Sequence, residues 1–569
     1  NLRLEADTDA SGVGAVTLGS VTIDAPLIVG DLGKEYSGKL MIGSNVSFAQ
    51  DAETFGLLTY SAGSLSVASG KTLTLKGGMN WVGGGTINGP GTMALPSGQT
   101  LAMSGFADHA LNNATFNNAG TTTSSISGAQ LLLNNGSVFN NSGTYRFLTG
   151  GDNITRNAGT GTFNNTGTLE VSGAITNAVN NVAFTNTGGT LASGTGTLNL
   201  NSDGSHSGSI TITGSAVRFT NGTHTFADGT SMAGQLNVAG ATASFGTVTA
   251  NGLLDYSSGA ITVTGGDTLT LAGGMNWVGG GTINGPGTMA LPSGQTLAMS
   301  GFADHALNNA TFNNAGTTTS SISGAQLLLN NGSVFNNSGT YRFLTGGDNI
   351  TRNAGTGTFN NTGTLEVSGA ITNAVNNVAF TNTGGTLASG TGTLNLNSDG
   401  SHSGAISLTG TAVNFAASTH SFADSTTIAG QLNLVGATAN FGTVTTNGLV
   451  NFSNGAINVT SGDTLTLNGG MNWTGGVNIN GPGTISLPSG QTLAMSGAAS
   501  RGFINTATFN NAGTTTSNIG GSQLVVHNSS IFNNSGTFRF LGNGDNISVS
   551  VGTGTFNNTG TLEVSGAIT

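Results

Sequence analysis

The sequence predicts an all-β protein in which a single elongated parallel β-solenoid runs through the 569 residues. Residues 77–208 recur letter for letter as residues 273–404, and a third, diverged copy runs from residue 469 to the last residue. Inside each copy the motif Phe-Asn-Asn-x-Gly, or a close variant, returns every 21 to 24 residues. A short repeat inside a long one indicates stacked turns rather than separate globular cores.

The local pattern predicts short strands and little or no helix. Residues 72–75 and 197–200 read Thr-Leu-x-Leu, with apolar side chains on one face and polar side chains on the other. Gly, Asn-Gly, Ser-Gly and Asn-Asn interrupt such runs at strand-length intervals, and these residues tolerate turns. No apolar period of 3.6 residues extends over a dozen residues.

The short repeat also predicts the inside of the stack. A spacing of about 22 residues fits one turn of two or three strands, with equivalent residues of adjacent turns about 4.8 Å apart. We expect the phenylalanines to stack as an internal column and the asparagines to form amide ladders, with glycine at a corner that a Cβ would block. The residues assigned to this stack and ladder are Phe116, Asn117, Asn118, Phe139, Asn140, Asn141, Phe163, Asn164, Asn165, Phe184, Phe312, Phe335, Phe359, Phe380, Phe509, Phe532 and Phe556.

A row of separate β-sandwiches is the alternative architecture. The evenness of the short repeat favours the solenoid, which with about 26 turns would form a rod on the order of 120 Å. In such a stack each turn contacts only its neighbours, so stability is expected to add along the axis.

The 196-residue register, which begins near residue 39, predicts the organisation of the chain. Upstream turns (1–37) precede copy one (38–233), copy two (234–429) and a truncated copy three (430–569), all in one continuous solenoid. The diverged spacers 209–272 and 405–468 show which positions tolerate change. Ile212 becomes Leu408, whereas Arg218 becomes Asn414. This pattern indicates an apolar inside of constant volume beneath a freely varying outside.

The composition excludes several functional classes. The chain contains 96 glycines, 6% charged residues and no cysteine, so neither disulfides nor thiolate metal sites can form. A composition this biased is typical of disordered chains, but 27 regularly placed phenylalanines argue against disorder. A formal charge of −11 with only 12 basic residues leaves no basic patch, so we expect no nucleic-acid partner. No apolar run approaches about 18 residues, so this segment is not expected to span a membrane.

The two ends indicate a piece of a longer chain. The first residues lack the charged and apolar regions of a signal peptide, and residue 569 stops in the middle of the repeat pattern.

The charged residues do not predict an enzyme. Solenoid enzymes that cleave polysaccharides need paired carboxylates, or a carboxylate with a base, at a fixed separation. Copy three replaces the stretch around Asp108 and His109 by Ala-Ala-Ser-Arg-Gly, which removes both groups. We expect the other charged candidates to be solvated corner charges or ion pairs between turns. No catalytic residue is assigned, and a polysaccharide-degrading enzyme is only a remote alternative. The candidates weighed are Asp108 with His109, Arg146 with Asp152, Glu170, and Asp203 with His206.

No metal or other cofactor is predicted. Asp7 and Asp9 resemble the first half of a calcium loop, but Leu18 occupies the place of the bidentate glutamate, which favours an Asx-type turn. The seven histidines do not cluster at ligand spacing.

The three tryptophans are the candidate glycan contacts. Trp81, Trp277 and Trp473 recur every 196 residues in the motif GGMNW. Exposed rings would offer a platform for sugar faces, but the position of the motif between apolar runs favours burial at a corner.

The repeats resemble those of large Gram-negative surface adhesins of the filamentous-haemagglutinin-like type, which are exported by two-partner secretion. The resemblance rests on FNNTGTLEVSG, GTLNLNSDG and SGDTLTLNGG, with LRLEADTDASGVGAVTLGSVTI upstream, and it covers essentially the whole chain. It implies a right-handed parallel β-helix in an extracellular fibre at the cell surface or in a biofilm matrix. Some relatives bind matrix exopolysaccharide. Autotransporter passengers carry similar repeats, and no binding residue is carried over.

Two functional hypotheses follow. The first is a structural and adhesive stalk that mediates attachment to host or neighbouring cells, or cell–cell aggregation, with tandem copies setting its length. The second is a rod that itself binds extracellular polysaccharide at sites repeated once per copy, so that weak sites gain avidity. Self-association through exposed strand edges is a further expectation.

Overall fold

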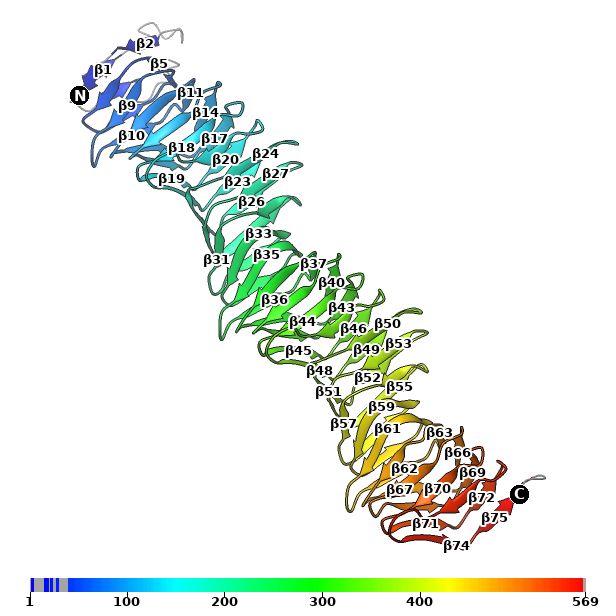
Figure 1. Ribbon diagram of the computed structural model, residues 1–569. Coiled ribbons are helices and arrows are strands. Elements are labelled where there is room, and N and C mark those ends of the chain that lie inside the picture. The colour runs from blue at the N-terminus through cyan, green and yellow to red at the C-terminus, as the bar shows by residue number, and fades with distance from the viewer. Residues whose placement is uncertain (1, 5–14, 20, 24–26, 30–38, 566–569) are drawn as a thin grey trace. The chain divides into compact units, whose positions relative to one another are not determined.

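The computed structural model describes residues 2–4, 15–19, 21–23, 27–29 and 39–565. These ranges contain 75 strands and no helix (Figure 1). The chain divides into two compact units, Asn1–Asn276 and Trp277–Thr569, and each unit is a parallel β-solenoid. Together they make about 24 turns spaced about 22 residues apart, so the predicted fold class is confirmed. Within the described ranges no helix is long and apolar enough to cross a membrane.

Three faces make up each turn of unit 1, because up to β30 every strand pairs in parallel with the strands three places before and after it. Face 1 contains β1 (Leu2–Leu4), β4 (Leu27–Val29), β7 (Ala52–Thr54), β10 (Thr72–Leu75), β13 (Thr92–Leu95), β16 (Thr115–Asn118), β19 (Ser137–Asn141), β22 (Gly161–Asn165), β25 (Ala183–Thr187), β28 (Gly204–Ser207) and β31 (Thr223–Phe226). Face 2 contains β2 (Ala15–Leu18), β5 (Lys39–Ile42), β8 (Leu58–Tyr60), β11 (Met79–Val82), β14 (Thr100–Ser104), β17 (Thr121–Ser125), β20 (Thr144–Phe147), β23 (Thr168–Val171), β26 (Thr190–Ala192), β29 (Ser209–Thr213), β32 (Ser231–Ala233), β34 (Val248–Ala250) and β36 (Thr268–Leu271). Face 3 contains β3 (Val21–Ile23), β6 (Val46–Phe48), β9 (Ser64–Val67), β12 (Gly85–Asn88), β15 (His109–Asn112), β18 (Gln130–Asn134), β21 (Asn153–Thr155), β24 (Thr176–Val179), β27 (Thr197–Leu200) and β30 (Val217–Phe219).

Unit 2 reuses the same strand pattern. Strands β38 (Gly281–Asn284) to β62 (Thr464–Leu467) repeat the bounds of β12 to β36 at an offset of 196 residues, except that β58 (Thr426–Ala429) begins one residue earlier. The other strands from the unit boundary onward are β37 (Met275–Val278), β63 (Met471–Trp473), β64 (Asn478–Asn480), β65 (Thr484–Leu487), β66 (Thr492–Ser496), β67 (Arg501–Ile504), β68 (Thr508–Asn511), β69 (Thr514–Asn518), β70 (Gln523–Val526), β71 (Ser530–Asn534), β72 (Thr537–Phe540), β73 (Asn546–Ser548), β74 (Gly554–Asn558) and β75 (Thr561–Val564).

The core is built from side chains that alternate inward and outward along each strand. On face 1 the rings of Phe116, Phe139 and Phe163 stack nearly parallel, with successive centroids 5.1 and 5.2 Å apart. That distance is close to the spacing of adjacent strands, so each turn contributes one ring to the column. In the last described turn Phe556 stacks in the same way on Phe532 but is only half-buried.

Two ladders of asparagine side chains run beside the ring column, one inside the stack and one outside. Inside, the Asn118 amide donates a hydrogen bond to Asn141 Oδ1 at 2.6 Å, and Asn141 donates onward to the next turn. Outside, Asn164 donates to Asn140 and Asn140 to Asn117, both at 2.8 Å. The buried amide N–H groups of Asn118 and Asn141 are therefore paired with the next turn, which offsets the cost of removing them from water.

Glycine occupies the corner after the asparagines for a steric reason. A Cβ atom at Gly143 would lie 2.0 Å from the carbonyl oxygen of Gly120 on the preceding turn. No other residue fits where two turns approach so closely.

The long repeat does not equal a whole number of turns. Strands β33 (Leu236–Phe245) and β35 (Leu254–Val263) pass from face 3 to face 1 without a corner. From β10 on face 1, the parallel pairings lead through nine turns to the second half of β35, still on face 1. The next strand, β36, has the sequence of β10 but lies on face 2, beside β34. Equivalent strands of copies one and two therefore occupy different faces of unit 1.

Unit 2 shows the same displacement by one face. Strand β40 (Thr296–Ser300) belongs to the face that continues through β43 and β46 to β62. Its counterpart in copy three, β66, lies on the neighbouring face with β41 and β44. One long repeat thus corresponds to nine turns and one additional face in both units.

Candidate functional site

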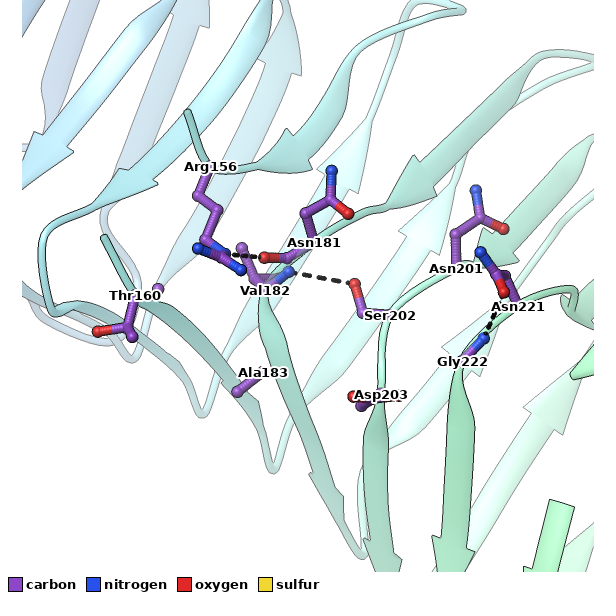
Figure 2. A pocket seen from close by; sticks show the side chains of 11 residues that line it. Arg156, Thr160, Asn181, Val182, Ala183, Asn201, Ser202, Asp203, Asn221 and Gly222 are labelled. Carbon is purple, nitrogen blue, oxygen red and sulfur yellow. Dashed lines mark hydrogen bonds between the residues drawn. The ribbon is translucent and has the colours of Figure 1, made fainter. Parts of the chain in front are cut away.

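A polar pocket of about 440 Å³ lies at the corner of unit 1 that joins face 3 to face 1 (Figure 2). The loops that follow β21, β24, β27 and β30 form it, so four successive turns contribute to one site. The polar side chains that line the pocket are those of Arg156, Thr160, Asn181, Asn201, Ser202, Asp203 and Asn221.

The pocket exists because this corner becomes shorter from one turn to the next. Residues 156–160 connect β21 to β22, whereas only residues 180–182 connect β24 to β25, and the two corners after that are equally short. The longer loop is supported from the turn below, where the Asn135 and Gly136 N–H groups donate to the Ala158 and Thr160 carbonyls at 3.0 and 2.6 Å. The loop therefore stands out as a ledge above a recessed surface.

Arg156 is fixed at the ledge end of the pocket. Its Nε atom donates to the carbonyl oxygen of Asn181, and one terminal nitrogen donates to the carbonyl oxygen of Gly159. Asn181, whose carbonyl accepts the first of these hydrogen bonds, is a corner residue with a positive φ of 54°. Asparagine tolerates this conformation better than most residues. The other terminal nitrogen has no hydrogen-bond partner among the described residues, and the side chain is exposed.

Asp203 provides the opposite charge. One carboxylate oxygen accepts a hydrogen bond from the Thr223 N–H at 2.8 Å, which ties two turns together. The second oxygen has no partner among the described residues, and neither has the side-chain amide of Asn181. With Arg156, these groups give the pocket free donors and acceptors, no net charge and no aromatic wall. This set matches a ligand rich in hydroxyl groups better than a phosphate or an apolar molecule.

Copy two forms the corresponding pocket in unit 2, with a volume of about 500 Å³. Arg352, Asn377 and Asp399 take the places of the three residues just described, and Arg352 makes the same two backbone contacts. This part of the sequence is copied letter for letter, so the two pockets share these contacts. The wall beyond the verbatim block differs, with Ala417 and Ser418 at the positions of Asn221 and Gly222. Copy three has Val549 at the position of Arg156, so it lacks the guanidinium.

Two buried histidines lie directly beneath the pocket wall. His206 Nε2 is 3.1 Å from His224 Nδ1, and His224 Nε2 is 3.2 Å from the carbonyl oxygen of Asn221. Burial lowers the pKa of His224 to about 4, and burial together with the neighbouring His224 lowers the pKa of His206 well below its usual value. Gly204 leaves the room for both rings, since its Cβ would lie 2.5 Å from His224 Nδ1. The sequence did not reveal this pair, because 18 residues along the chain correspond to one turn of the stack.

The charged residues weighed as catalytic candidates bind within the fold. Arg146 donates to Glu170 on the next turn, as an ion pair between turns. Asp152 was expected to be a solvated corner charge or an ion-pair partner, and this is wrong. Its fully buried carboxylate accepts hydrogen bonds from the Ser124 hydroxyl at 3.0 Å and from the Ile126 and Gly128 N–H groups at 2.9 Å.

Asp108 is the last residue of a corner, and His109 is the first residue of β15. Asp108 accepts a hydrogen bond from the Gln130 N–H of the next turn at 2.9 Å. His109 is fully buried, with its two ring nitrogens each 2.9 Å from a carbonyl oxygen, those of Ala107 and Trp81. The two side chains point to different partners, so they do not form an acid–base pair.

The tryptophans are buried, at no more than 1% exposure for Trp81, Trp277 and Trp473. The rings are buried as expected, but they lie within strands β11, β37 and β63 and not at corners, and none of the three ring faces is open to a sugar. The large apolar side chains that protrude most from the described surface are Phe106 and Phe302, each 88% exposed on the loop that precedes the buried histidine. Copy three has Ala498 at this position. The calcium candidate at Asp7 and Asp9 falls outside the described residues.

Comparisons with known proteins give no relative. No protein-family model, no curated protein and no solved structure matches the chain.

Proposed function

We propose that this chain is part of a structural and adhesive stalk in a bacterial cell-surface or biofilm-matrix fibre. Exported by two-partner secretion, the fibre would mediate attachment to surfaces or aggregation between cells. The sequence resemblance supports the extracellular location and the export route.

One structural observation supports the function of a stalk. The contacts inside the stack join adjacent turns: the side-chain amides of Asn118 and Asn141 each donate to the next turn, and the phenylalanine rings beside them stack from turn to turn. A copy can then be added without any new contact in the existing turns, because interactions in a solenoid are local along the axis. Duplication of such a copy lengthens the stack and adds no new chemistry, and the near-verbatim copies fit this expectation.

The experiment is a reach assay on cells. Cells would display an affinity tag beyond a stalk of one, two or three copies, and antibody-coated beads would be captured through that tag. Capture of cells that carry a surface polysaccharide layer should increase with copy number, since only a longer stalk clears the layer. Equal capture by all three stalks would contradict the proposal that the chain acts as a stalk whose length is set by the number of copies.

The corner pockets favour a second candidate function, a rod that binds extracellular polysaccharide at repeated sites. Arg156 and Asp203 place hydrogen-bonding groups in a recess of suitable size, and copies one and two each provide such a recess. Two weak sites on one chain would gain avidity on a polymer. A glycan array probed with the whole chain tests this function, and absence of binding to every polysaccharide would exclude it.

We propose no catalytic role for the corner charges. Arg146 and Glu170 bind each other, and Asp152 supports three groups of the adjoining turn. Catalysis would need a free carboxylate pair at a fixed distance from a sugar linkage. Measurable release of reducing sugars by the chain would overturn this proposal.

A further inference from the structure

We propose that each corner pocket binds the terminal segment of an unbranched, neutral polysaccharide lengthwise, with about one sugar per turn of the stack. This inference rests on the polysaccharide-binding function proposed above. It adds the class of glycan, its direction and the part of the chain that binds.

The direction of the bound glycan follows from the way the lining residues are distributed over the turns. Asn181, Asn201 and Asn221 come from three successive corners, and Figure 2 shows them one after another along the recess. Neighbouring turns are about 4.8 Å apart, so four corners span about 14 Å. An extended β-linked glycan advances by a similar length for each sugar. A chain laid along the stack would therefore meet one corner per sugar, over about three sugars, whereas a chain laid across the stack would meet only one corner.

The binding of the end of the polysaccharide follows from the ledge formed by the loop 156–160. The loop 156–160 is longer than the three corners that follow it and closes the recess on its side. On the far side β33 runs from face 3 to face 1 with no corner loop, so nothing comparable blocks the exit there. A sugar chain can leave in one direction only, which places its terminal residue against Arg156.

The neutral character follows from the charges. The guanidinium of Arg156 and the carboxylate of Asp203 are the only charged groups in the lining, and they cancel. The remaining groups are amides and hydroxyls, which exchange hydrogen bonds with sugar hydroxyls in both senses. A polyuronate would bring several carboxylates to a pocket with a single cation. The pocket in unit 2 has the same pair, Arg352 and Asp399.

The test is a titration of the whole chain with cello-oligosaccharides of one to six sugars, followed by calorimetry. Affinity should rise up to about three sugars and then stay constant, and oligogalacturonates of equal length should bind at least about tenfold more weakly. At equal mass, a polymer cut into shorter chains should bind more protein, because it has more ends.

Variants with a matched control locate the site. The double variant Asp203→Ala and Asp399→Ala should weaken binding about tenfold, as loss of a charged hydrogen-bonding group does. Asp228 and Asp424 hold the same kind of backbone N–H, at 2.9 Å, outside the pockets. Their alanine variants should bind like the unaltered chain, and circular dichroism should show the same strand content for all.

The outcomes separate this inference from the function on which it rests. A positive glycan array with binding that the Asp203 and Asp399 variants do not change would overturn the pocket assignment and leave polysaccharide binding standing. Equal affinity for one and three sugars would overturn the lengthwise mode, and tighter binding of oligogalacturonates would overturn the neutral class. A blank array would overturn both the inference and the function.

Discussion

At the scale of single residues, the buried histidine pair is the feature that responds to solution conditions. His206 occupies the row that holds Asn165 and Asn186 on the preceding turns and Phe226 on the next, so it stands where the polar ladder ends and an aromatic row begins. Its ring stacks on Phe226 with centroids 4.6 Å apart, and Phe219 lies edge-on to His224 at the same distance. Only neutral imidazoles suit such apolar surroundings.

We predict that acid destabilises these turns. His224 has a pKa of about 4 in the folded chain because of its burial, against 6.5 for the exposed group, and Asp203 is the one charge that opposes the shift. Between these values the unfolded chain binds more protons than the folded chain, so the free energy of unfolding falls as pH falls. The stability is complete above about pH 6.5, and His224 accounts for a loss of about 3 kcal/mol by about pH 4.

Urea denaturation at a series of pH values would measure this loss. A chain with leucine at His206, His224, His402 and His420 is the control, since it lacks both pairs and should lose far less stability across that range. If the unaltered chain and this control showed the same slope of unfolding free energy against pH, the histidines would not be responsible.

At the scale of elements, the strands were predictable and the corners were not. The phenylalanine repeat and the glycine positions determine which residues face inward, and side-chain alternation then follows from the strand itself. The pocket depends instead on a difference in loop length between adjacent corners. The only sign of this in the sequence is the shortening of the interval between phenylalanines, from 24 residues before Phe163 to 21 after it.

Two further features escaped prediction for a related reason. The exposed Phe106 lies in the corner before β15 and the buried His109 begins that strand three residues later, and no periodicity tells which of the two faces inward. The displacement by one face arises where β33 and β35 lose a corner, and the alternation within each strand is unaffected there. Sequence periodicity reports the inside of a strand, whereas corner geometry depends on the turn below.

The corner of His109 leads to a prediction from copy three, where Arg501 takes its place. Arg501 donates to the Trp473 and Ala499 carbonyls at 3.1 and 2.7 Å, the counterparts of the two oxygens that His109 faces. A neutral imidazole has a single N–H and can donate to only one of them. His109→Arg should therefore stabilise copy one at neutral pH by about 1 kcal/mol, and His109→Ala should destabilise it.

Chemical denaturation at neutral and acidic pH would test this exchange. Burial lowers the pKa of His109, while the two carbonyls, Asp108 and Asp152 oppose that shift, so the doubly donating imidazolium forms only in acid. The advantage of arginine should shrink there. Because Arg501 precedes Gly502 where His109 precedes Ala110, His109→Arg with Ala110→Gly is the companion variant. Arginine no better than alanine in either background would contradict the prediction.

At the scale of the whole molecule, the displacement by one face determines how a repeated surface group is presented. In unit 1 the strand that begins at Thr72 lies on face 1, and its copy that begins at Thr268 lies on face 2. In unit 2 the strands that begin at Thr296 and Thr492 differ in the same way. A group that recurs once per copy therefore changes face between copies. Within each unit, surrounding polymers would therefore meet such a group on more than one side.

Removal of one copy should leave the remaining stack folded. Deleting residues 77–272 joins Lys76 to Gly273 and restores the native sequence TLTLKGGMNW across the junction. Every remaining turn keeps a native neighbour, and nearest-neighbour stability then predicts a melting temperature within a few degrees of the full chain. The removed nine turns and one face correspond to about 45 Å of stack within unit 1, so small-angle scattering should show a smaller radius of gyration. A control deletion of residues 77–283, which ends inside β38, breaks the pairing pattern and should lower the melting temperature sharply. If both deletion variants had the same melting temperature, the copies would not be interchangeable length units, and the proposed stalk function would lose its main support.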